Sequence, residues 1–126
     1  MASNNYDIRF RALVVADLLM DRVFHRTELQ QHGFVTMGAQ DIEEVALCLE
    51  SDQKFDLTVV GMWRPITTFE IVAALRAFGD PSKVLVVTDS LEVGVQSILL
   101  GADDFLYIPF TFEELAEKLR RFGFIN

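Results

Sequence analysis

The chain has 126 residues, a length typical of one domain rather than two. Its composition, 51% apolar and 24% charged, is that of a folded globular protein and argues against a disordered one. The net charge of −8 argues against binding to nucleic-acid phosphates or to an anionic membrane surface. The one cysteine, Cys48, excludes an internal disulfide framework and a cysteine-rich metal site.

Residues 1–10 contain no apolar segment of the kind that a signal peptide needs. The aliphatic runs along the chain are far shorter than the ~20 residues that span a bilayer. We therefore expect a cytoplasmic domain.

Five short apolar runs rich in β-branched residues alternate with longer segments of helical pattern. Nearly continuous apolar runs are typical of strands that are buried on both faces of a parallel sheet. The five predicted strands are Ala12–Ala16, Phe34–Met37, Leu57–Val60, Val84–Val87 and Phe105–Ile108.

Start signals place helices between these strands. Capping boxes at Asp41 and Thr111 predict helices from about Ile42 and Phe112, and Ser90 predicts a helix to about Leu100. In the first and third helices, residues at i, i+3, i+4 and i+7 predict a face that points toward the core. In the third helix, Ile71 and Leu75 widen this face. The predicted inward residues are Met20, Val23, Phe24 and Thr27 in the first, and Phe69, Val72, Ala73 and Arg76 in the third.

This (βα)5 pattern predicts an α/β fold with a doubly wound parallel sheet and right-handed crossovers. Sites in such sheets lie at the carboxyl ends of the strands. There the sequence offers Asp17 and Thr88 but no lysine, no histidine and no glycine-rich phosphate loop, which argues against nucleotide or flavin binding.

Three segments resemble the receiver domain of two-component response regulators. They are Val14-Val15-Ala16-Asp17, Phe55-Asp56-Leu57-Thr58-Val59-Val60 and Gly101-Ala102-Asp103-Asp104-Phe105-Leu106-Tyr107-Ile108-Pro109-Phe110. The resemblance implies one CheY-like, flavodoxin-like domain over residues 1–126, with its core at about 11–122 and a five-stranded sheet of order 2-1-3-4-5. It leaves open whether the Ile108–Pro109 bond is cis.

Receiver chemistry needs an acceptor aspartate, a Mg²⁺ held by acidic neighbours, a lysine and a hydroxyl. Carried over by position, the acceptor place is Gly61, the first acidic place is Ala16 and the lysine place is Ile108. Ile108 is also expected to form an apolar wall where the cation would sit. The resemblance therefore implies a degenerate pseudo-receiver that binds no Mg²⁺, contains no metal or other cofactor, and is not an enzyme.

The residual pocket is predicted to consist of Asp17, Thr88, Asp89 and Trp63. Thr88 matches the family's switch hydroxyl, and the carboxylate of Asp89 would repel a phosphodonor. Asp17 is either a remaining metal ligand or a local hydrogen-bond acceptor. Trp63, which is flanked by Met62 and Arg64, either closes the vacated pocket or binds a partner.

The resemblance also implies a switch and interaction face made of the fourth helix, the fifth strand and the fifth helix. Phe105 takes the aromatic switch place, and Tyr107, Lys118 and Arg120 lie on the same face. Asp103 and Asp104 are expected to pair with Lys118 and Arg120, although a solvated charged face is the plainer interpretation.

We therefore expect a phosphorylation-independent module of bacterial signalling that binds a protein partner or a second copy through this face and controls an output domain. We expect it to bind neither nucleic acid nor membrane. The alternatives are a small-ligand sensor that uses the altered pocket, or a receiver phosphorylated at another carboxylate such as Asp17 or Asp56.

Overall fold

Five parallel strands form one sheet in the order β2-β1-β3-β4-β5, as predicted. The computed structural model describes residues 9–61 and 63–126, so the interpretation of residues 1–8 and of Met62 lies outside it. The strands are β1 (Arg11–Val15), β2 (Val35–Ala39), β3 (Leu57–Val60), β4 (Lys83–Thr88) and β5 (Asp104–Tyr107). Each differs from its predicted range by no more than two residues at either end.

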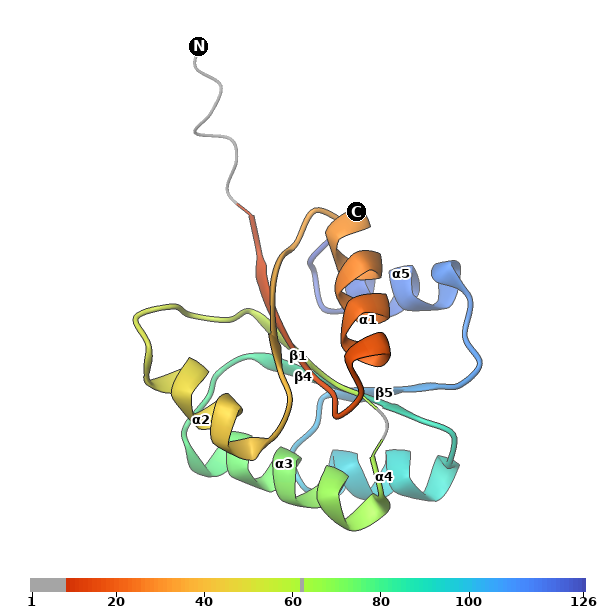
Figure 1. Ribbon diagram of the computed structural model, residues 1–126. Helices are drawn as coiled ribbons and strands as arrows, with labels where there is room; N and C mark the ends of the chain where they lie inside the picture. Colours follow the sequence, from red (N-terminus) through yellow and green to blue (C-terminus); the bar gives the residue numbers. More distant parts are fainter. Residues whose placement is uncertain (1–8, 62) are drawn as a thin grey trace.

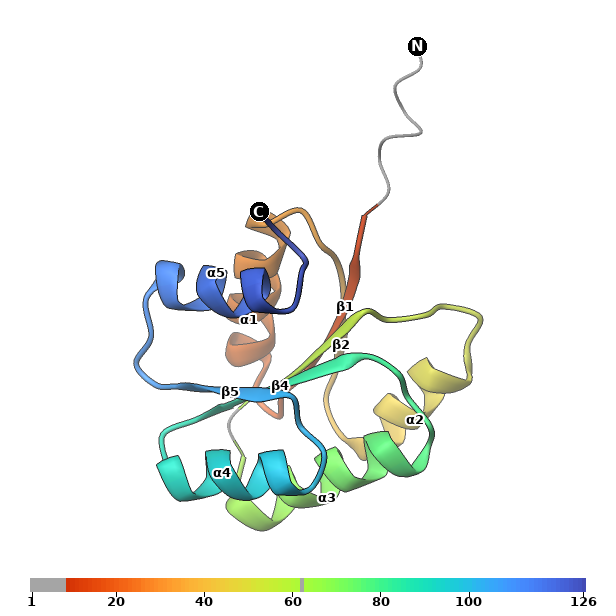
Figure 2. The same cartoon turned by 180° about the vertical axis from the view of Figure 1, so that it is seen from behind.

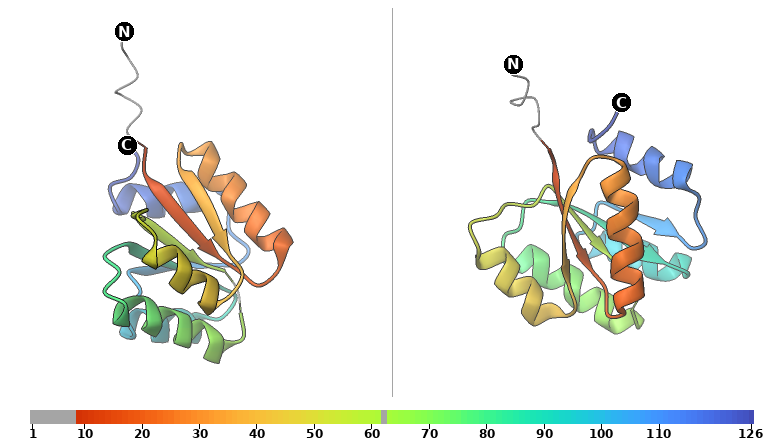
Figure 3. Two further views of the ribbon diagram at one scale, coloured as in Figure 1. Left: turned by 60° about the vertical axis from the view of Figure 1, so that its left-hand side comes forward. Right: turned by 45° about the horizontal axis from the view of Figure 1, so that its top comes forward.

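Helices cover both faces of this sheet (Figure 1). They are α1 (Leu19–Gln31), α2 (Ile42–Glu50), α3 (Pro65–Ala77), α4 (Leu91–Leu99) and α5 (Phe112–Arg121). Figure 2 and Figure 3 show α1 and α5 on one face and α2, α3 and α4 on the other.

Alternate residues of the central strands supply two separate hydrophobic cores, because successive side chains of a strand point to opposite faces. Leu13 and Val15 pack with the buried residues of α2 and α3, including Ile71. Val14 packs instead with the residues of α1 and α5, including Leu119. This two-sided burial explains the nearly continuous apolar runs.

The predicted caps are present. The side chains of Asp41, Ser90 and Thr111 accept backbone N–H bonds at the starts of α2, α4 and α5, and Thr111 with Glu114 forms a full capping box. The fourth helix is followed by Gly101, whose φ of 122° is a conformation that favours glycine.

The predicted inward face of α1 is wrong. Met20, Val23 and Phe24 are exposed by 76%, 49% and 54%, and the buried residues of the helix are His25 and Leu29. The inward face of α3 is right in part, since Ile71, Val72 and Leu75 are buried. Of the remaining predicted positions of α3, Ala73 is exposed and Phe69 and Arg76 are only half-buried.

Arg76 was predicted to lie on an apolar face, but its guanidinium joins three segments near the amino ends of β4 and β5. It donates hydrogen bonds to the backbone carbonyls of Gly101 (2.8 Å), Asp80 (3.0 Å) and Ser82 (2.9 Å). It also forms an ion pair with Asp103 at 2.8 Å. The side chain thereby fastens the end of α3 to the turns before β4 and β5.

Arg76→Met is expected to lower the free energy of unfolding by about 2 kcal/mol, because three carbonyls and a carboxylate lose a charged donor. Urea denaturation followed by circular dichroism measures the change. Arg121→Met, at an exposed position of α5, is the matched control and should change stability by less than about 0.5 kcal/mol. Equal effects of the two substitutions would contradict the assigned role.

Candidate functional site

The carboxyl ends of β1, β3 and β4 open into a cavity of about 660 Å³. Asp17 follows β1, Trp63 follows β3, and Thr88 and Asp89 lie at the end of β4, so all four residues of the predicted pocket border one space. Among the described residues, the lining consists of Asp17, Leu18, Trp63, Arg64, Pro65, Thr67, Thr88, Asp89, Ser90 and Val93.

Gly61 and Ala16 are in direct contact at the base of this region. The backbone N–H of Gly61 donates to the carbonyl of Val15 at 2.8 Å. A Cβ atom on Gly61 would lie 3.0 Å from the Cβ of Ala16 and 3.4 Å from the Val15 oxygen. A side chain at the acceptor position would therefore be in tight contact with the end of β1, and its neighbours would have to shift by a few tenths of an ångström.

Trp63 is half-buried and packs against the core on the α2 and α3 side of the sheet. Its indole N–H donates to the carbonyl of Val15 at 3.4 Å. The ring borders the cavity on one side and, on the other, a smaller hollow of about 170 Å³ rimmed by Asp41 and Glu70. It thus closes one side of the pocket and leaves the rest open.

Ile108 does not line this cavity, which corrects the expectation that it would form an apolar wall there. It lies after β5 and lines a separate cavity with residues of α1. The Ile108–Pro109 peptide bond is cis.

Arg22, which no sequence motif marks as a site residue, reaches from α1 back over the loop after β1. Its guanidinium donates to the carbonyl oxygens of Ala16 at 2.6 Å and Asp17 at 2.8 Å. This places a fixed positive charge beside the carboxyl end of β1.

The predicted switch residues differ in exposure. Thr88 is 4% exposed, and its hydroxyl accepts the backbone N–H of Ser90 at 3.1 Å. The Phe105 ring is half-buried against Gly94 of α4, whereas Tyr107 on the same strand is 47% exposed. Tyr107 is therefore available at the surface, and Phe105 is packed inward.

Of the two basic residues expected to pair with Asp103 or Asp104, one does so. Lys118 pairs with Asp104 at 3.0 Å. Arg120 pairs within its own helix, with Glu113 at 2.8 Å and Glu117 at 3.5 Å, and not with Asp103. The correction follows from the position of Asp103, whose carboxylate is already bound by Arg76.

Asp56 lies at the opposite end of β3 from the cavity. Its carboxylate accepts the backbone N–H of Arg11, the first residue of β1, at 2.8 Å. Within residues 9–61 and 63–126, no cluster of three or more His, Cys, Asp or Glu side chains is arranged to hold a metal ion. No helix in this described part of the chain is long and apolar enough to cross a membrane.

Comparisons with known proteins agree with this fold. The two-component response regulator PhoP of Pseudomonas aeruginosa is 32% identical over 124 residues, which cover 92% of this chain and 55% of PhoP. The response regulator MprA of Mycolicibacterium vanbaalenii is 35% identical over 113 residues, covering 87% of this chain and 48% of MprA. The chain thus spans about half the length of these relatives. No family model matches it.

Solved structures show the same arrangement. The chemotaxis response regulator CheY4 of Vibrio cholerae superposes with a TM-score of 0.73 at 26% identity, covering 90% of this chain and 98% of CheY4. The response regulator TrrA of Thermotoga maritima, solved in complex with Mg²⁺ and BeF, gives a TM-score of 0.74 at 28% identity, with 90% and 98% covered.

Strand order, helix placement and these similarities together define a CheY-like domain. Over about nine-tenths of its length the chain is similar in sequence and in fold to the receiver domains of response regulators.

Proposed function

We propose that this domain is a pseudo-receiver, which signals through protein contacts without accepting a phosphoryl group or binding Mg²⁺. The observation that carries the proposal is the contact between Gly61 and Ala16, because a Cβ at the acceptor position would lie 3.0 Å from the Ala16 side chain. A lone Asp17 is a poor site for a hard divalent cation, which prefers several carboxylate ligands. Arg22 adds a competing positive charge nearby.

Beryllofluoride with Mg²⁺, which mimics a phosphorylated aspartate, tests this proposal. We expect no saturable change in Trp63 fluorescence or in the amide NMR shifts of Asp17, Thr88 and Asp89. TrrA, which is solved with Mg²⁺ and BeF, is the positive control. Saturable Mg²⁺-dependent shifts at these residues would contradict the proposal, as would labelling of the chain by radioactive acetyl phosphate.

The proposed contact surface is the face of α4, β5 and α5. Apolar side chains of α4 are exposed, with Leu91 at 60%, Val95 at 52% and Leu99 at 74%, and Tyr107 of β5 is 47% exposed. The Lys118–Asp104 pair between α5 and β5 supplies orientation more than affinity. An exposed apolar patch with charged neighbours suits a second copy or a protein partner, and the negative net charge suits neither nucleic acid nor membrane.

Sedimentation velocity tests self-association through this face. We expect an association that does not change with Mg²⁺ and beryllofluoride and that Leu99→Glu weakens at least tenfold. Leu47→Glu is the matched control, because Leu47 is 67% exposed on α2. The relatives are about twice as long as this chain, and we propose that such contacts control an output domain.

A small-ligand sensor is the second candidate, and the 660 Å³ cavity bordered by Trp63 favours it. A ligand held there by Asp17 and Asp89 would raise the melting temperature of the chain, and Asp89→Asn would reduce that increase. A thermal-shift screen of small cations and polar metabolites tests this candidate.

A further inference from the structure

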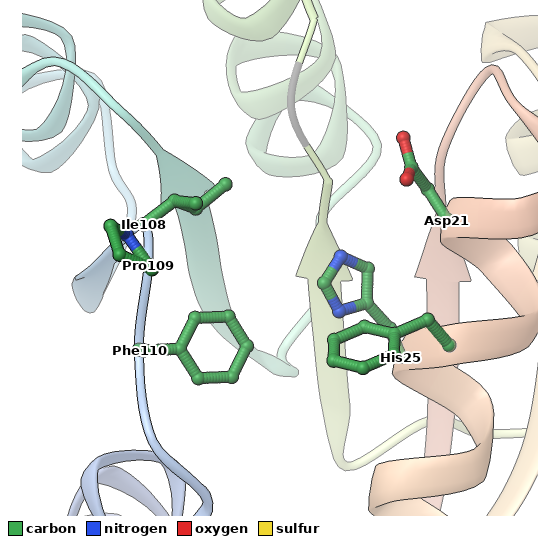
Figure 4. Close-up of a pocket in the computed structure, with 6 residues that line it drawn as sticks. Asp21, His25, Ile108, Pro109 and Phe110 are labelled. Atoms are coloured by element: carbon green, nitrogen blue, oxygen red, sulfur yellow. The ribbon is translucent and has the colours of Figure 1, made fainter.

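A second cavity, of about 250 Å³, lies between α1 and the segment that follows β5. Figure 4 shows Asp21 and His25 on α1, with Ile108, Pro109 and Phe110 on the opposite side of the space. Phe24 also lines it. Neither the receiver fold nor the proposed function assigns a role to this cavity.

His25 is the central polar group of this cavity. The residue is only 8% exposed, and its imidazole lines the cavity. Burial lowers the pKa of the imidazole, and the nearby carboxylate of Asp21 opposes that effect only in part. A neutral imidazole has one N–H donor and one acceptor nitrogen, so His25 can offer either to a group bound in the cavity.

The walls around His25 are aromatic and aliphatic. Its ring is stacked with that of Phe110, with centroids 6.3 Å apart and planes inclined by 17°. Phe24 meets it edge-on at 5.4 Å. Ile108, at the position where receivers have their lysine, makes this side of the cavity apolar and uncharged. Aromatic walls of this kind favour a flat ring in stacked or edge-on contact.

The size and charge of the cavity further restrict the class of ligand that it can bind. A dry cavity of about 150 Å³ is known to hold benzene, so 250 Å³ accommodates one substituted ring and little more. Asp21 is the only charged side chain in the lining, and its carboxylate repels an anionic ligand.

We propose that the cavity between α1 and the Ile108–Phe110 segment binds a small neutral single-ring aromatic molecule, with His25 hydrogen-bonding its one hydroxyl or N–H group. This site is separate from the 660 Å³ cavity, and the inference does not depend on the loss of phosphorylation. A failed phenol titration would therefore leave the beryllofluoride test unaffected, and the reverse also holds.

Phenol and toluene, which have similar size and differ in one hydroxyl, are the probes. In NMR titrations we expect phenol to cause saturable shifts at Phe24, His25, Ile108 and Phe110 with a Kd of about 1 mM. Toluene should bind about fivefold to tenfold more weakly, because it forms no hydrogen bond with the imidazole. Benzoate should bind more weakly than phenol because of Asp21.

His25→Phe is expected to abolish the preference for phenol over toluene, and His25→Gln is expected to keep part of it. Phe78→Leu, at an exposed phenylalanine after α3 that does not line the cavity, is the matched control and should leave both affinities unchanged. Dispersed amide spectra confirm that each variant folds. If His25→Phe does not fold, the phenol-to-toluene ratio of the unmodified chain decides the question.

Two results would overturn the inference. The first is phenol binding that shows no saturation at the cavity residues up to about 20 mM, or no preference over toluene. The second is N-acetyl-tyrosinamide binding more tightly than phenol, because that result would assign the cavity to an aromatic side chain of a partner protein.

Discussion

Gly61→Asp, which returns an aspartate to the acceptor position, is expected to lower the free energy of unfolding by about 4 kcal/mol and to restore no phosphorylation. The new Cβ would lie 3.0 Å from the Cβ of Ala16, so the neighbouring atoms at the end of β1 must shift by a few tenths of an ångström. The carboxylate would also lie close to the Val15 carbonyl, which already accepts hydrogen bonds from Gly61 and Trp63. Ile108 supplies no cation to pair with it, and the nearby Arg22 guanidinium already donates to the carbonyls of Ala16 and Asp17.

Gly61→Ala separates the steric part of this effect from the electrostatic part. It is expected to cost about 1–2 kcal/mol, from crowding against Ala16 alone. The further cost of the aspartate comes from a carboxylate that is charged and unpaired in the folded state, which raises its pKa above the unfolded value. This electrostatic loss of stability should become smaller as pH falls, because the carboxyl group is then protonated in the folded protein.

Urea denaturation at pH 7 and pH 4.5 measures both contributions. Ala73→Asp, at an exposed position of α3, is the control for adding a carboxylate. A Gly61→Asp variant as stable as the unmodified chain, or one labelled by acetyl phosphate, would show that the site still accommodates an acceptor. The steric argument for the pseudo-receiver proposal, which rests on the closeness of position 61 to Ala16, would then fail.

The order of strands and the two-sided burial could be predicted because they follow from local patterns. Continuous apolar runs such as Leu57–Val60 require burial on both faces of a sheet, and the caps at Asp41 and Thr111 depend only on residues three positions away. The four pocket residues were also grouped correctly, because the carboxyl ends of parallel strands meet at one edge.

The inward face of α1 could not be predicted, because tertiary contacts of polar side chains set the rotation of that helix. Arg22 binds the carbonyls after β1, and Arg26 donates to the Thr36 hydroxyl of β2 at 3.1 Å. These bonds turn Met20 and Val23 outward and bury His25. The hydrophobic period of a sequence does not reveal such long-range bonds, so the cavity around His25 emerged only from the structure.

Gly94→Ala is expected to destabilise the domain by about 3 kcal/mol, although alanine has the higher intrinsic helix preference by about 1 kcal/mol. Gly94 lies within α4, and a Cβ there would lie 2.5 Å from two carbon atoms of the Phe105 ring. The ring therefore occupies the space that any larger residue at this position would need. Glycine at this position allows Phe105 to pack inward while Tyr107 stays exposed on the proposed interaction face.

The Phe105→Ala background should reverse the sign of this effect. Once the ring is removed, the new methyl group has space, and Gly94→Ala is expected to stabilise the chain by about 1 kcal/mol through helix preference alone. Urea denaturation of the four chains of this double-mutant cycle measures the coupling. An equal loss of stability in both backgrounds would show that Gly94 acts through something other than Phe105. Sedimentation of Gly94→Ala then tests the interaction face, because displacement of Phe105 from its inward position should alter association through α4 and β5.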